Sequence, residues 1–98
     1  GKRNYKQNAY ARYLSGIFFE MIDEPDNAYI DYKEVHKLEP AFELVRADLY
    51  RLAKRGQRFD DLERWEKEKL FTEADKKTAE RLPRASDKGE LIVLYENG

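Results

Sequence analysis

The chain has 98 residues, the size of one domain with a single modest core. It contains no cysteine, so disulfide bonds, thiol catalysis and cysteine-ligated zinc are excluded. Charged residues make up 40% of the chain, but the 19 basic and 20 acidic side chains nearly cancel, so binding of nucleic acid would need a local basic patch. No apolar run approaches the roughly 20 residues of a membrane helix, and no signal peptide is recognisable. We therefore expect a single domain over residues 1–98 that is intracellular, most simply cytoplasmic.

The N-terminal part predicts two helices and one short strand. Between residues 5 and 22 the apolar residues recur every three or four positions, which is typical of an amphipathic helix. Gly16 weakens this helix but suits close packing of another element against it. A loop is expected over residues 23–27, because Pro25 disfavours helix in the residue before it. Ala28–Asp31 is predicted to be a short strand, followed by a brief helix over residues 32–38.

Two further helices are predicted in the middle of the chain. Pro40 suits the first turn of a third helix, and Gly56 is a good stop for it. Asp61 is a plausible N-cap for the fourth helix, whose acidic start complements the helix dipole. Thr72 and Asp75 have the spacing of a capping box, which indicates a break or a new helix start at that point.

The C-terminal part contains the clearest strand, Glu90–Glu96. A lone strand is not stable, and Ala28–Asp31 is the best internal candidate for its partner. The predicted fold is therefore α+β and mostly helical, with about four helices and a small two-stranded β element. Trp65 on the fourth helix is expected to be a core residue.

Residues that could perform catalysis are few. His36 is the only histidine, and neither serine lies in a nucleophile motif. Pro25-Asp26 followed by Asp31 and Lys33 superficially follows a nuclease pattern, but the gap between its halves is too short. The five scattered glycines form no phosphate-binding loop, and the acidic clusters match no calcium loop. We expect no enzymatic activity, no cofactor and no metal site.

The apolar positions between Ile30 and Gly56 resemble helix-turn-helix and winged-helix spacing, in which a short helix packs at an angle against a longer recognition helix. At 100° per residue the basic residues of the third helix fall opposite its apolar arc, so Arg51 and Lys54 are expected to project from the core. The resemblance implies a winged-helix-like core and a nucleic-acid-binding regulator that contacts phosphates and bases.

Three features weigh against that alternative. No β-hairpin wing is predicted after Gly56, Glu43 and Asp48 interrupt the basic stripe, and cations near a helix C-terminus are favoured by the helix dipole alone. The seven tyrosines exceed what so small a core can hide, and tyrosine and arginine are typical anchors of protein interfaces. The candidate binding residues are Tyr10, Arg46, Tyr50, Arg51, Lys54, Arg55 and Arg58.

The preferred hypothesis is a small non-catalytic interaction protein that occludes or bridges the surface of another macromolecule, such as an inhibitor of the phage or plasmid type or an assembly subunit. A protein is the favoured partner and nucleic acid the alternative. No membrane contact is expected, and the sequence leaves the oligomeric state open.

Overall fold

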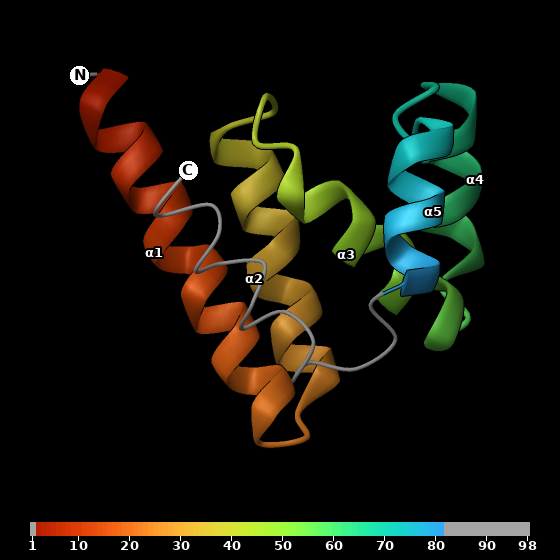
Figure 1. Ribbon diagram of the computed structural model, residues 1–98, viewed down its shortest axis with the longest axis horizontal. Coiled ribbons are helices and arrows are strands. Elements are labelled where there is room, and N and C mark those ends of the chain that lie inside the picture. Colours follow the sequence, from red (N-terminus) through yellow and green to blue (C-terminus); the bar gives the residue numbers. More distant parts are fainter. Residues whose placement is uncertain (1, 82–98) are drawn as a thin grey trace.

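The computed structural model describes the backbone of residues 2–81 and the side chains of residues 8–81. Five helices follow one another in this part of the chain: α1 Lys2–Met21, α2 Pro25–Leu38, α3 Leu44–Arg55, α4 Phe59–Lys67 and α5 Glu73–Arg81. α1 and α2 form an antiparallel hairpin, and α4 and α5 lie on the other side of α3 (Figure 1). Because α3 contacts α2, α4 and α5, it is the central helix.

The described part of the chain is all-helical, so the predicted α+β fold is wrong there. Ala28–Asp31 is not a strand but the second turn of α2, which begins with Pro25 in its first turn. A four-residue window is too short to separate a buried strand from a buried turn of helix. The winged-helix-like core loses its preceding strand with this correction. The other predicted strand, Glu90–Glu96, lies outside the described residues.

Three helices end in the same backbone motif. Asp23, Gln57 and Lys69 follow α1, α3 and α4 with φ angles of 61°, 55° and 55°, which is the left-handed region. In each case the N–H of the next residue donates to the carbonyl five positions earlier, as in a Schellman motif. The predicted stop at Gly56 is confirmed, because α3 ends at Arg55 and Gly56 is its C-cap; Gly56 itself has a φ of −87°, and the left-handed residue is the next one, Gln57.

The predicted helix starts are only partly correct. Thr72 Oγ1 accepts from the N–H of Asp75 at 3.1 Å, and Asp75 Oδ2 accepts from the N–H of Thr72 at 2.9 Å. This reciprocal capping box confirms the new start and divides the predicted fourth helix into α4 and α5. Pro40, by contrast, lies in the loop before α3, and Asp61 lies in the first turn of α4, whose N-cap is Arg58.

The core is built around buried aromatic rings. Tyr32 of α2 is fully buried and lies so close to Gly16 of α1 that a Cβ added there would be 2.8 Å from Tyr32 Cδ1. The expected close approach at Gly16 is therefore confirmed. Trp65 is also buried, edge-on to Tyr29 and to Phe71, as expected of a core residue. These contacts hold α4 against α2.

Candidate interaction surfaces

The predicted basic stripe of α3 does not form one surface. Arg51 is buried, and its Nη2 donates to Glu20 of α1 at 2.6 Å and to Asp48 at 3.3 Å. Glu20 also accepts from the Tyr32 hydroxyl at 2.6 Å. Lys54 is exposed, as expected, but the prediction that Arg51 projects from the core is wrong. The helical wheel places Arg51 opposite the apolar arc of α3, and on that side it pairs with Glu20 of α1.

The hydroxyl groups around Arg51 remain protonated at neutral pH. Burial raises the pKa of both Tyr13 and Tyr32, and the carboxylate of Glu20 raises each of them further. Arg51 Nε and Nη1 have no hydrogen-bond partner within the described residues. This cluster is therefore a structural junction between α1, α2 and α3, closed to a ligand approaching from outside.

Two other predicted site residues also contact neighbouring helices. Arg46 Nε donates to Asp75 Oδ2 at 3.0 Å, which ties α3 to α5. Tyr50 packs edge-on against Phe71, and the ammonium group of Lys54 lies 5.1 Å from the centre of its ring. These side chains stabilise the packing of α3.

The remaining predicted residues lie nearer the surface and apart from one another. Tyr10 is half-buried on α1, whereas Arg55 and Arg58 are exposed at the end of α3 and in the turn that follows. Arg55 and Arg58 line one shallow hollow of about 250 Å³, together with Pro25, Asp26, Tyr29, Leu52 and Gly56. The structure thus brings together two of the seven predicted residues at one open surface.

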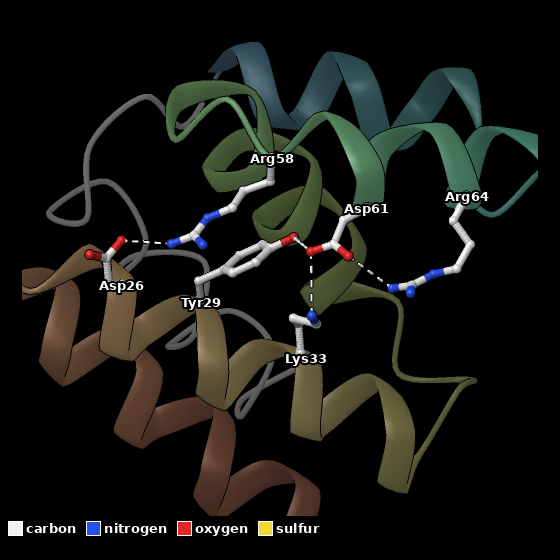
Figure 2. A network of polar contacts seen from close by, with 6 residues as sticks. All are labelled: Asp26, Tyr29, Lys33, Arg58, Asp61 and Arg64. Carbon is white, nitrogen blue, oxygen red and sulfur yellow. Dashed lines mark hydrogen bonds and ion pairs between the residues drawn. The ribbon is translucent and has the colours of Figure 1, made fainter.

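A polar network crosses the junction between α2 and α4 (Figure 2). Asp61 of α4 lies at its centre and accepts from the Tyr29 hydroxyl at 2.7 Å, from Lys33 at 3.3 Å and from Arg64 at 3.0 Å. At its edge, Arg58 donates to Asp26 at 2.8 Å, and its guanidinium lies 5.0 Å from the centre of the Tyr29 ring. Of these residues only Arg58 was predicted from the sequence to be a binding residue, because the network is brought together by the packing of two helices.

The electrostatics of this network favour an ionised Asp61. Burial by itself raises the pKa of Asp61, but hydrogen bonds from Tyr29 and Lys33 outweigh it and hold the pKa below its usual value. Burial, the hydrogen bond to Asp61 and its charge raise the pKa of Tyr29, so this hydroxyl stays a donor. Nearby, burial lowers the pKa of His36, which lines a second hollow of about 370 Å³ beside Trp65.

These networks offer no arrangement for metal binding or metal-assisted chemistry in the described residues. No group of three histidine or acidic side chains there is placed to hold a metal ion. The Asp61 carboxylate is saturated by three donors and faces no activated nucleophile. The α2–α4 network therefore acts as a clamp between two helices.

One side of α1 is apolar and exposed. We call it the α1 face, and it consists of Leu14, Phe18, Met21 and Ile22. Phe18 is 58% exposed and Met21 68%, whereas Tyr13 and Ile17 on the other side of the same helix are buried. The two sides point roughly 100° apart at 100° per residue, so α1 has one packed and one open apolar side.

The α1 face was not predicted from the sequence, because all apolar residues of the helix fit one periodic pattern. The signal was present in the adjacent pairs Tyr13-Leu14, Ile17-Phe18 and Met21-Ile22. A helix that meets a single neighbour needs an apolar stripe only a little over 100° wide, and adjacent pairs widen the stripe beyond that. The pairs therefore predict apolar side chains on two sides of α1.

Comparison of the chain with protein-family models, with curated proteins and with solved structures finds no match. No helix in residues 2–81 combines the length and apolar character needed to cross a lipid bilayer.

Proposed function

We propose that this chain is a non-catalytic protein-binding domain that contacts its partner through the α1 face. The observation that carries this proposal is the exposure of four large apolar side chains on one side of a helix whose other side is already packed. Contiguous exposed apolar patches on a domain of this size mark interaction sites. The proposal keeps the interaction role expected from the sequence and moves its site from α3 to α1.

A pattern in the α1–α2 hairpin supports this proposal. Gly16 with Phe19, Ala28 with Tyr32, and then Pro40 follow the order and spacing that are typical of tetratricopeptide repeats. Such repeats are helical hairpins of about 34 residues that stack side by side and bury their apolar sides against neighbours. The contact between Gly16 and the Tyr32 ring provides the physical reason for that spacing.

The resemblance has clear limits. The repeat pattern has tryptophan and leucine where this chain has Arg12 and Ser15. Both of these residues contact Asp31 of α2, Arg12 at 3.3 Å and Ser15 at 2.7 Å. The second hairpin, α3–α4, does not repeat the pattern. The resemblance therefore supports a hairpin that accepts a neighbour along α1, without placing the chain in that family.

The nucleic-acid alternative has less support. Two of the arginines on which it depended, Arg46 and Arg51, donate to carboxylates of α5 and α1. Freeing them for phosphate would leave Asp75 and Glu20 buried without their partners.

The test is affinity capture from the native host with three matched baits, each with and without nuclease. The baits are the wild-type chain, Phe18→Glu, and a control, Phe59→Glu, because Phe59 is 66% exposed but lies on α4. We expect a protein that survives nuclease and binds the wild type and the control but not Phe18→Glu, because a charge on the α1 face is costly to bury. Equal capture by all three baits, or capture of nucleic acid alone, would contradict the proposal.

A further inference from the structure

We infer that the shallow hollow lined by Arg55 and Arg58 binds the free carboxyl end of a polypeptide whose last residue is apolar. We call it the arginine hollow. It lies between the start of α2, the end of α3 and the turn that follows, and its volume is about 250 Å³. It shares no residue with the α1 face, so the inference is independent of the proposed function.

The floor of the arginine hollow is apolar. Tyr29 and Leu52 line the hollow, and each is only 4% exposed. The Tyr29 hydroxyl donates to Asp61, so Tyr29 offers the hollow its ring rather than its polar end. Pro25 at the start of α2 adds a further apolar surface. A ligand of this hollow therefore needs an apolar body.

The rim of the arginine hollow carries an excess of positive charge. Arg55 is exposed, and no carboxylate in residues 8–81 pairs with it. Figure 2 shows Arg58 reaching across to Asp26, to which it donates at 2.8 Å, and its guanidinium lies 5.0 Å from the centre of the Tyr29 ring. Two guanidinium groups thus face one carboxylate. Because the planar fork of arginine matches a carboxylate, the uncompensated charge indicates a ligand with a carboxylate of its own.

Asp26 shows how the carboxylate of a ligand can be held. The side chain of Asp26 is 86% exposed, so its pair with Arg58 is only weakly favourable and can be exchanged. A ligand carboxylate that replaces Asp26 at Arg58 also gains the attraction of Arg55. Asp26 is therefore a competitor for the same guanidinium, and its neutralisation should tighten the binding of the ligand.

The volume of the hollow favours a chain end over a free small molecule. Pockets that enclose a small molecule typically measure about 300–1,000 Å³ and bury most of its surface. The arginine hollow is smaller and shallow, so it accommodates one residue and leaves the rest of a ligand outside. The end of a polypeptide meets this condition, because its last side chain and its carboxylate enter the hollow while the preceding residues lie along the surface.

Titration of the isotope-labelled chain with an acetylated tripeptide that ends in leucine tests the inference. The backbone amide signals of Gly56 and Arg58, both of which line the hollow, report on binding. We expect a dissociation constant on the order of 0.1 to 1 mM, because the contact is small. The same tripeptide with a carboxamide end, or with glycine as its last residue, should bind about tenfold more weakly. The first probe lacks the charge, and the second lacks the apolar side chain.

Two pairs of variants test the roles of the charges. Arg55→Gln should weaken binding several-fold, whereas Lys77→Gln on α5, an exposed control of the same charge change outside the hollow, should not. Asp26→Asn should tighten binding several-fold, whereas Glu63→Gln on α4 should leave it unchanged. A gain of affinity cannot arise from a loss of folding, so the Asp26 variant tests the inference even if Arg55→Gln destabilises the chain.

Four results would overturn the inference. The first is the absence of any shift at Gly56 and Arg58 with the tripeptide at millimolar concentration. The second is equal affinity for the free carboxyl and carboxamide forms, and the third is unchanged or weaker binding by Asp26→Asn. The fourth is binding of N-acetyl-leucine as tight as that of the tripeptide, which would make the ligand a free small carboxylate instead of a chain end.

Discussion

Two of the arginine–carboxylate pairs that join the helices differ greatly in depth. At the junction of α1 and α3, Arg51 and Glu20 have side chains that are only 7% and 5% exposed. At the junction of α2 and α4, the outermost pair has side chains that are 41% exposed at Arg58 and 86% at Asp26. The chemistry and the distances are similar, but the solvent around the two pairs is not.

The difference in depth determines what each pair does for the fold. A buried arginine has lost its hydration, so removal of its partners or of the arginine itself leaves a charge that water cannot reach. The charges of an exposed pair are hydrated whether or not the two side chains touch, so the pair contributes little to the free energy of unfolding. The α2–α4 junction therefore depends on the packing of Tyr29 against Trp65 and on Asp61, with the Arg58 pair as a minor addition.

The largest expected effect is that of Arg51→Ala. It leaves Glu20 and Asp48 buried without their common cation, which should lower the free energy of unfolding by about 3–5 kcal/mol. Arg51→Lys keeps the charge but not the planar fork, so its loss should be smaller. Urea denaturation of both variants measures these losses. A variant Arg51→Ala that is as stable as the wild type would show that this junction is open to water.

An intermediate effect is expected for Asp61→Asn. The variant weakens the hydrogen bonds from Tyr29 and Lys33, and we expect a loss of about 1–2 kcal/mol at neutral pH. Because the pKa of Asp61 is lowered in the folded state, its contribution is fully present above the ordinary value of 3.8 and is lost as the pH falls through the folded-state pKa. The difference in stability between wild type and variant should therefore shrink below about pH 4.

His36 provides an internal check on that experiment. Burial lowers its pKa in the folded state, so it destabilises both proteins as the pH falls below its ordinary value of 6.5. This loss is common to wild type and Asp61→Asn and cancels in their difference. A difference that shrinks already near pH 6 would mean that His36 and Asp61 titrate together.

The smallest effect is expected for Asp26→Asn, at the exposed end of the comparison. Its carboxylate is 86% exposed, so loss of the pair with Arg58 should change the free energy of unfolding by less than about 1 kcal/mol. The change should shrink further in high salt. If Asp26→Asn lowered the free energy of unfolding as much as Arg51→Ala, burial would not explain the difference between the two pairs.

The sequence by itself determined the features that depend on neighbouring residues. The spacing of apolar residues predicts α1, and the Thr72–Asp75 pair predicts the start of α5, because a capping box is complete within four residues. Trp65 is correctly placed in the core, since so large an apolar ring is costly to expose. The close contact at Gly16 was also predictable, although its partner Tyr32 was not.

Only the tertiary structure decided the features that depend on which helices meet. Ala28–Asp31 fits a strand or a helix equally well over four residues, and packing against α1 settles it as helix. Arg51 and Lys54 have the same charge and lie one turn apart, but Arg51 is buried in its pair with Glu20 of α1, whereas Lys54 is exposed. A periodic pattern fixes the direction in which each side chain points around the axis of its helix. How deeply that side chain is buried depends on which element lies in that direction, and this is decided by the packing of the whole chain.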